Sequence, residues 1–488
     1  MKAALEKLNQ ELGELEENLI QATQHRQIYL KSLPKAQGVS AENLIQYLYF
    51  RSEDRKALQE KLHLYGLSAL SNSENHIHRQ IQTIRERLGQ AYEKDQLNPC
   101  TYTYSQEKIK ENSRLLFGKP DKAGLPVLMV TFDRAFATDP NLIENLLLHG
   151  MNVARINCAH DDENVWKSMI DQIRKAETKT GKSCKIHMDL AGPKIRTVLL
   201  GKGKKKGNVK VVVGDTIWLS ETMDHFTDEQ IVLHPNEKGI ISSLAPGHRV
   251  LIDDGEIGGR VSETGPGRAA VTIDRVSSKK GRIKSEKGIN FPDTGLDIPS
   301  LTAYDKTCLP FICHHADILG YSFVKNPGDI QNLREALQKI GGPFPSLVYK
   351  IETPDSVSNL PELLLEGMKN PPFGIMIARG DLAVEIGFER LGEIQEEILW
   401  ICEAAHVPVV WATQVLENLQ KSGMPTRSEI TDAIQASLAE CIMINKGEHT
   451  ISVLESLKEI MLRTSGSRNK KRFTLGSLSM AQTFIQSS

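Results

Sequence analysis

The sequence has few cysteines, no excess charge of either sign and no long apolar run. Its seven cysteines lie at irregular intervals along 488 residues, which argues against a disulfide framework and favours a reducing compartment. Sixty Lys and Arg residues stand against 61 Asp and Glu residues, so the charge excess of a dedicated nucleic-acid or anionic-membrane binder is missing. We therefore expect neither a nucleic acid nor a membrane as a partner.

The lack of long apolar segments also indicates where in the cell we expect the protein. The first residues, 1–6, lack the continuous apolar core of a signal peptide. The apolar stretch 142–154 is interrupted by Glu144, His149 and Asn152, so it cannot cross a bilayer. Hydrophobic residues still make up 40% of the chain, which is enough to bury a large core. We expect a soluble, multi-domain, cytoplasmic protein.

Residues 1–120 carry a helical pattern and no catalytic motif. A leucine stripe recurs there at steps of three and four residues: Leu5, Leu8, Leu12, Leu15 and Leu19. We expect Pro34 and Gly38 to end this segment and Ser40 to cap the next helix. The stripe needs an apolar partner, which is either another chain, as in a homo-oligomer, or helices of the same chain packed as a bundle.

Short β-branched runs alternate with helical patterns from about residue 125 onward. Eight such runs are candidate strands: 127–131, 153–156, 185–188, 318–323, 347–351, 374–378, 408–413 and 441–444. Eight βα units favour a closed (β/α)8 TIM barrel, which we assign to residues 121–198 and 287–465.

A segment of different character, 199–286, separates the third and fourth runs. It is rich in Gly and Val, with alternating strands separated by turn signals, and we expect an inserted all-β domain. Insertion at a βα loop places it over the carboxyl end of the barrel, as a lid or as a passive insertion. Residues 466–488 form a C-terminal tail.

Polar side chains follow five of the predicted strands. They are Arg155 and Asn157, Asp189, Lys350 and Glu352, Arg379 to Asp381, and Thr413. Residues two apart share a face of a strand, so these groups should meet at the carboxyl rim of the barrel, where barrel enzymes hold substrate. Two hard carboxylates, Glu352 and Asp381, suit Mg²⁺ or Mn²⁺. With Lys350 and Arg155 beside them, they predict a site for a phosphoryl group.

The segments that carry these residues resemble the motifs of pyruvate kinases. The matching segments are 150–157, 189–197, 253–255, 287–290, 348–352, 378–382, 412–417 and 425–427, in the family order. The resemblance covers roughly residues 125 to 463. It implies transfer of the phosphoryl group of phosphoenolpyruvate to ADP, giving pyruvate and ATP, with a divalent metal ion.

The resemblance also implies roles for individual residues. Arg155 would contact the transferring phosphate, Lys350 would stabilise its developing charge, and Glu352 and Asp381 would hold the metal ion. Thr413 would help to relay a proton to the enolate carbon.

Further binding roles follow from the same resemblance. Backbone N–H groups of Gly380 and Asp381 would meet the substrate carboxylate at a helix N-terminus. The nucleotide would be bound by four residues, namely Asn157, His160, Arg196 and Lys287.

The chain departs from the family at its potassium site. Ala159 and Leu190 stand where the family has a Ser and a Thr ligand, beside the retained Asn157 and Asp189. Lys194 stands where potassium-dependent members carry Glu, so its ammonium group could replace the ion, as in potassium-independent members. We expect activity without a requirement for K⁺.

Other departures lie near the nucleotide and at the end of the chain. Residues 131–134 place Asp133 where it would repel phosphates unless Arg134 offsets it, and residues 445–448 also differ from the family. We expect the C-terminal α/β domain of the family to be absent. Two alternatives stay open: a metal-dependent lyase or aldolase acting on pyruvate or oxaloacetate, and a catalytically impaired relative that binds a partner.

Overall fold

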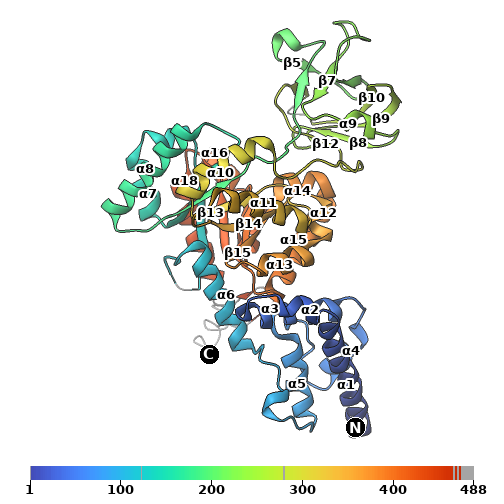
Figure 1. The fold of residues 1–488 in the computed structure, drawn as a ribbon, viewed down its shortest axis with the longest axis vertical. Coiled ribbons are helices and arrows are strands. Elements are labelled where there is room, and N and C mark those ends of the chain that lie inside the picture. Colours follow the sequence, from blue (N-terminus) through green and yellow to red (C-terminus); the bar gives the residue numbers. More distant parts are fainter. Residues whose placement is uncertain (1, 123, 278–280, 465–467, 470–471, 474–488) are drawn as a thin grey trace, which may run out of the picture.

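The centre of the molecule is a closed barrel of eight parallel strands (Figure 1). The computed structural model describes residues 2–122, 124–277, 281–464, 468–469 and 472–473. Around the barrel the strand order is β1-β17-β16-β15-β14-β13-β3-β2. The strands are β1 Val127–Thr131, β2 Met151–Asn157, β3 Lys185–Asp189, β13 Ile318–Tyr321, β14 Ser346–Ile351, β15 Phe373–Ala378, β16 Val409–Ala412 and β17 Cys441–Ile444. The predicted (β/α)8 barrel is confirmed.

Helices between these strands cover the outside of the barrel. They are α7 Pro140–Leu148, α8 Glu163–Thr180, α10 Ala303–His315, α11 Pro327–Ile340, α12 Pro354–Ser358, α13 Leu360–Met368, α14 Arg379–Ile386, α15 Phe388–Ala404, α16 Glu417–Ser422, α17 Arg427–Ala436 and α18 Thr450–Thr464. Inside the barrel, a separate apolar cluster includes Val153, Ile318, Val348 and Met376. Outward-facing and inward-facing strand residues therefore build two distinct cores.

The predicted all-β insertion follows β3 and stands above the barrel in Figure 1. Its seven-stranded sheet has the order β12-β8-β9-β10-β6-β7-β4, and a two-stranded ribbon pairs β11 with β5. Its elements are β4 Thr197–Leu199, β5 Asn208–Lys210, β6 Thr216–Ser220, β7 Val232–Pro235, α9 Ile240–Ser243, β8 Arg249–Ile252, β9 Ile257–Gly265, β10 Arg268–Val276, β11 Arg282–Lys284 and β12 Ile289–Asn290. We call this domain the lid.

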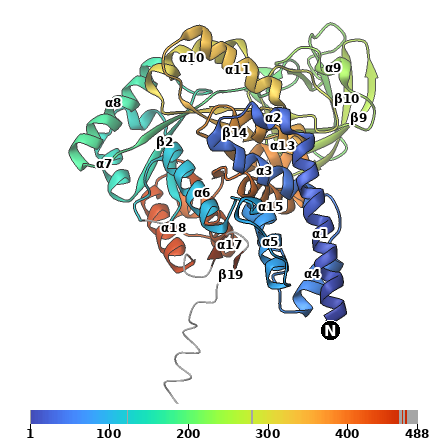
Figure 2. The same cartoon turned by 60° about the horizontal axis from the view of Figure 1, so that its bottom comes forward.

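The N-terminal helices lie at the opposite end of the barrel from the lid (Figures 1 and 2). They are α1 Lys2–His25, α2 Gln27–Lys31, α3 Lys35–Arg51, α4 Lys56–Leu64, α5 Ile77–Arg87 and α6 Tyr102–Phe117. Leu8, Leu12, Leu15 and Leu19 are buried in the same apolar cluster as residues of the barrel helices. Packing within the chain thus occupies the leucine stripe, and it gives no support to an oligomer built through that stripe.

One helix boundary was predicted wrongly. Gly38 and Ser40 lie inside α3, which begins after Pro34, and Ser40 is fully buried. Ser40 Oγ lies 2.9 Å from Nδ1 of His406, a residue that follows α15. Proline is compatible with the start of a helix, because N–H groups there have no partner within the helix and proline has none to lose. A glycine within a helix costs about 1 kcal/mol, and burial of α3 against the barrel outweighs this cost at Gly38.

The predicted tail 466–488 lies almost wholly outside the described residues. From it the structure describes two short paired strands, β18 Arg468–Asn469 and β19 Arg472–Phe473. No helix in the described part of the chain is both long enough and apolar enough to cross a bilayer.

The helical region contains a buried ionic network around Glu16. Its carboxylate accepts hydrogen bonds from Gln82 at 2.8 Å, from the hydroxyl of Tyr92 at 2.6 Å and from the guanidinium of Arg85, and it lies 3.2 Å from Nε2 of His78. Burial alone would raise the pKa of Glu16. The hydrogen bonds outweigh burial and lower this pKa from 4.5 to about 2.

We expect Glu16→Gln to lower the free energy of unfolding by about 3 kcal/mol at pH 7, because a buried ion pair loses one partner. The folded pKa lies below the unfolded one, so this contribution is present above about pH 4.5 and is lost as the pH falls toward 2. Urea unfolding at several pH values measures it. Glu11→Gln, which removes an exposed partner of Lys61, is the control and should change little.

Candidate active site

The carboxyl ends of β2, β3 and β14 bring four predicted residues together. Oδ2 of Asp189 accepts a hydrogen bond from Nε of Arg155 at 2.7 Å and forms an ion pair with its Nη2 at 2.6 Å. Nζ of Lys350 lies 3.7 Å from the same oxygen and 3.0 Å from Oε1 of Glu352. All four side chains are buried, so two cations and two carboxylates balance each other away from water.

Burial by itself would oppose the charged forms of this cluster. For Asp189, the charges of Lys350 and Arg155 and the hydrogen bond from His187 outweigh burial and hold its pKa well below the usual range. For Lys350, the charges of Asp189 and Glu352 outweigh burial and raise its pKa. Both groups are therefore ionised at neutral pH, and Lys350 presents a fixed positive charge.

One contact of Lys350 was missed at the sequence level. Its Nζ donates to Oγ of Ser322 at 2.8 Å, and this hydroxyl donates in turn to the carbonyl oxygen of Leu190 at 2.7 Å. Ser322 directly follows β13, the fourth barrel strand. The rule that polar residues at strand ends meet at the rim would have found it, had it been applied to this strand.

Glu352 and Asp381 could hold a divalent metal ion. Burial, and after it the neighbouring charge of Asp381, raise the pKa of Glu352 against the lowering effect of Lys350. Two carboxylates that disfavour each other's charge are relieved by a cation, and hard oxygen donors fit Mg²⁺ or Mn²⁺. Within the described residues no group of three or more His, Cys, Asp or Glu side chains could hold a metal. Oxygen atoms of substrate or water could supply further ligands.

Gly380, Asp381 and Thr413 lie together at the ends of β15 and β16. Gly380 and Asp381 are in the first turn of α14, where backbone N–H groups lack partners within the helix. A Cβ atom at Gly380 would lie 3.4 Å from Oγ1 of Thr413.

Arg379 holds these two strand ends together. Its guanidinium donates to the carbonyl oxygens of Ala412 (3.2 Å) and Thr413, pairs with Asp432 and stacks on the Trp411 ring 4.8 Å away. Asp432 belongs to α17, and nothing in the sequence around it indicated this role.

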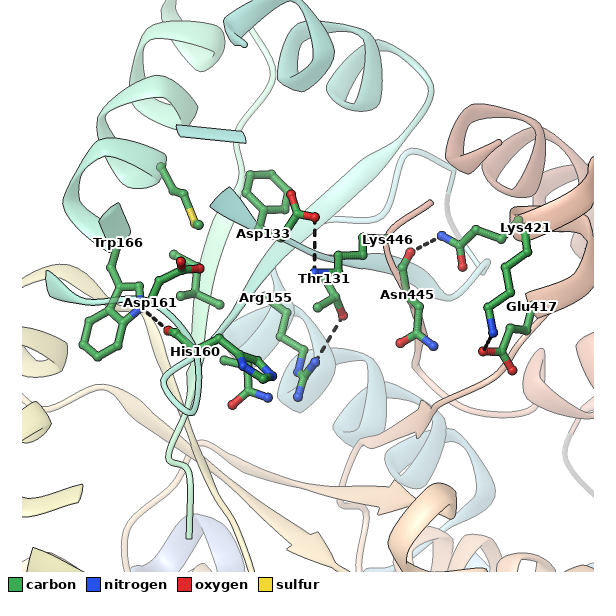
Figure 3. Close-up of a pocket in the computed structure, with 15 residues that line it drawn as sticks. Thr131, Asp133, Arg155, His160, Asp161, Trp166, Glu417, Lys421, Asn445 and Lys446 are labelled. Carbon is green, nitrogen blue, oxygen red and sulfur yellow. Dashed lines mark hydrogen bonds and ion pairs between the residues drawn. The ribbon is translucent and has the colours of Figure 1, made fainter. Parts of the chain in front are cut away.

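A cavity of about 310 Å³ adjoins the charged cluster (Figure 3). It is lined by Thr131, Phe132, Asp133, Arg155, Ile156, Asn157, His160, Asp161, Trp166, Met169, Glu417, Gln420, Lys421, Asn445 and Lys446. Arg155 reaches both sites, since it also donates to Oγ1 of Thr131 at 3.2 Å. The cavity combines apolar walls with polar groups, as small-molecule sites do.

Two of the four predicted nucleotide residues line this cavity. These two residues are Asn157 and His160. Burial, and after it the charges of Lys446 and Arg196, lowers the pKa of His160. Arg196 and Lys287 lie at the base of the lid instead. Arg196 donates to the carbonyl oxygen of Glu286 at 3.1 Å, and Nζ of Lys287 lies 3.0 Å from Asp253.

The sequence of this chain is similar to those of known proteins. The family described as "Pyruvate kinase, barrel domain" matches residues 130–451. The pyruvate kinase of Bacillus licheniformis is 30% identical over 337 residues, which is 68% of this chain and 55% of the relative. The pyruvate kinase of Sporosarcina psychrophila is 31% identical over 335 residues, 67% of this chain and 55% of the relative.

This chain belongs to the pyruvate kinase family. It spans about half the length of the curated relatives that it matches. The predicted family membership, made from the strand-end motifs, is confirmed.

Lys194, the predicted substitute for a potassium ion, joins the lid to the barrel. Its Nζ donates to Oδ1 of Asp381 at 2.7 Å and lies 3.9 Å from Asp254 of the lid. Burial opposes its charge, but Asp381 outweighs burial and raises the pKa of Lys194. A positive charge therefore stands beside the carboxylates of Asp381 and Glu352.

The charge balance near Asp133 differs from our expectation. Arg134 does not offset Asp133, because its Nε donates to Asp161 at 3.0 Å. Nζ of Lys446 lies 3.2 Å from Asp133 instead. The two departures from the family, after β1 and after β17, therefore compensate each other across the cavity (Figure 3).

The charged cluster also depends on a glycine of the neighbouring strand β13. A Cβ atom at Gly320 would lie 1.7 Å from Oδ1 of Asp189. We expect Gly320→Ala to lower the free energy of unfolding by about 2 kcal/mol through overpacking and to weaken binding of inorganic phosphate. Thermal unfolding and calorimetry measure the two effects.

Gly392→Ala is the matched control for that substitution. Gly392 lies within α15, and no described heavy atom outside its own segment is within 4 Å of a Cβ built there. This variant should gain roughly 0.5–1 kcal/mol of stability from better helix propensity and leave phosphate binding unchanged. Equal behaviour of the two variants would contradict the close approach at Gly320.

Proposed function

We propose that this chain transfers the phosphoryl group of phosphoenolpyruvate to ADP, forming pyruvate and ATP, with Mg²⁺ or Mn²⁺ and without a requirement for K⁺. One observation carries the proposal: Arg155 and Lys350 share the buried carboxylate of Asp189, directly beside the carboxylate pair of Glu352 and Asp381. Such an arrangement fits a migrating phosphoryl group, because negative charge spreads over its oxygens as it moves.

Arg155 and Lys350 would act on the phosphoryl group in different ways. The planar guanidinium of Arg155 reaches the cavity and can form paired hydrogen bonds to phosphate oxygens while Asp189 holds its other edge. The ammonium of Lys350 is a compact charge with a pKa above its usual value, so it stays protonated as charge develops beside it. When bound to Glu352 and Asp381, the divalent ion would supply Lewis-acid stabilisation.

Residues at the ends of β15 and β16 would serve the three-carbon part of the substrate. The N–H groups of Gly380 and Asp381, at the start of α14, are suited to a carboxylate. The hydroxyl of Thr413 lies near Gly380 and would help to relay the proton that the enolate carbon receives.

ADP would occupy the cavity that adjoins these groups. Asn157 and His160 line the cavity, and the lowered pKa of His160 keeps its imidazole neutral and able to accept a hydrogen bond. Arg196 and Lys287, at the base of the lid, would approach the phosphates when the lid closes. We place this activity in the cytoplasm, which agrees with seven free thiols, six of them buried.

Two substitutions test the phosphotransferase proposal in an assay of pyruvate formation from phosphoenolpyruvate, ADP and Mg²⁺. Lys350→Ala and Glu352→Gln should each lower kcat by roughly a thousandfold or more, because each removes charge at the transferring group. The controls are Lys339→Ala and Glu335→Gln, exposed on α11, which should retain the parent rate.

The alternatives have their own readouts. A parent protein that releases pyruvate from oxaloacetate, but forms none from phosphoenolpyruvate with any diphosphate tried, would support the lyase. A parent that is inactive in both assays would favour the catalytically impaired relative.

Potassium dependence provides a separate test. Because the ammonium of Lys194 already lies 2.7 Å from Asp381, rates with and without added K⁺ should agree within about twofold, a margin below 1 kcal/mol. Lys194→Gln should lower the rate without restoring a response to K⁺, since Ala159 and Leu190 offer no side-chain oxygen. A steep and specific rise of the parent rate with K⁺, absent with Na⁺, would refute this part.

A further inference from the structure

His187 is a titratable side chain in the barrel interior, directly beneath the phosphoryl site. It lies on β3 two residues before Asp189, so the two side chains share the inward face of the strand. Its neighbours in register are Arg155 on β2 and Ile318 on β13. His187 is fully buried.

One ring nitrogen of His187 has no hydrogen-bond partner in the described part of the chain. The inner cluster of the barrel is apolar and includes Val153, Ile318, Val348 and Met376. Burying an N–H group in such surroundings costs free energy unless it finds an acceptor. No described residue offers a hydrogen-bond partner to the buried Nδ1 of His187. A proton on Nδ1 would therefore have no acceptor among these residues.

The other ring nitrogen is well placed to carry that proton. Nε2 of His187 lies 2.7 Å from Oδ1 of Asp189, and an ionised carboxylate only accepts hydrogen bonds. Nε2 of the imidazole therefore carries a proton and donates a hydrogen bond to Asp189.

The pair is accommodated by a residue without a side chain. A Cβ atom at Gly320 would lie 2.6 Å from Nε2 of His187, in addition to its clash with Oδ1 of Asp189. Any side chain at position 320 would occupy the space of this hydrogen bond. Two neighbouring strands therefore contribute jointly to it.

We propose that His187 is a positioning residue, which fixes the carboxylate of Asp189 so that Asp189 in turn orients Arg155 toward the phosphate. With Oδ1 held by the imidazole, the carboxylate cannot rotate, and Oδ2 faces Nε and Nη2 of Arg155 at 2.7 and 2.6 Å. The same oxygen lies 3.7 Å from Lys350. The inference rests on the proposed function, because it assigns the oriented Arg155 to phosphate binding.

Three variants separate this role from simple packing. His187→Gln keeps an N–H donor at the same number of bonds from Cα, whereas His187→Leu removes the donor and keeps a side chain of similar bulk. Met376→Leu, in the same apolar cluster and without polar contacts to the site, is the packing control.

In the steady-state assay, His187→Leu should raise KM for phosphoenolpyruvate and lower kcat, together by about a hundredfold in kcat/KM, because Arg155 is misplaced. KM for ADP should stay within twofold. His187→Gln should recover most of the loss, and Met376→Leu should match the parent. A purely structural role would lower the melting temperature of both His187 variants without changing KM for phosphoenolpyruvate selectively, which would overturn the proposal.

Two further measurements do not need turnover. Nitrogen-15 NMR of histidine-labelled protein should show a hydrogen-bonded Nε2–H signal that disappears in His187→Leu. Calorimetry with inorganic phosphate should show at least tenfold weaker binding to His187→Leu than to His187→Gln, the same order as the expected KM change. An imidazole without a proton on Nε2, or equal phosphate affinities, would refute the positioning role, even in a protein that proves to be an active kinase. The expected results in a protein that forms no pyruvate would leave positioning intact and refute the phosphotransferase.

Discussion

The site depends on one buried carboxylate that holds two cations side by side. Without Asp189, the guanidinium of Arg155 and the ammonium of Lys350 would repel each other in a region largely closed to water. With Asp189 present, the two cationic groups are held in place at the carboxyl end of the barrel. Arg155, Asp189 and Lys350 come from three different strands, so closure of the barrel sets the distances between them.

The ends of the barrel support this arrangement from both sides. At the lower end, Leu116 and Phe117 of α6 join the inner apolar cluster, and Ser40 of α3 meets His406 beside α15. At the upper end, contacts from Lys194 to Asp254 and from Asn290 to Glu385 connect the lid to the rim. The helical region is thus part of the core that holds the strands in place, and the lid adjoins the site.

Reasoning from the sequence predicted which side chains come together at the rim, because parallel strands end there. Arg155, Asp189, Lys350 and Glu352 all followed from that rule, as did the carboxylate Asp381. The rule misses residues that lie below the rim or come from elsewhere. His187 is one layer deeper in the barrel and Asp432 belongs to a covering helix, so neither has a local signal.

Local periodicity alone determined the eight strands, the inserted β domain and the helical character of the first third. These features depend on the spacing of apolar residues along one segment, which can be read directly from the sequence. Tertiary structure alone decided which polar side chains pair. Asp133 with Lys446, Arg134 with Asp161 and Ser40 with His406 join segments far apart in sequence. Such pairs form only in the closed barrel, because closure brings the side chains of different segments next to each other.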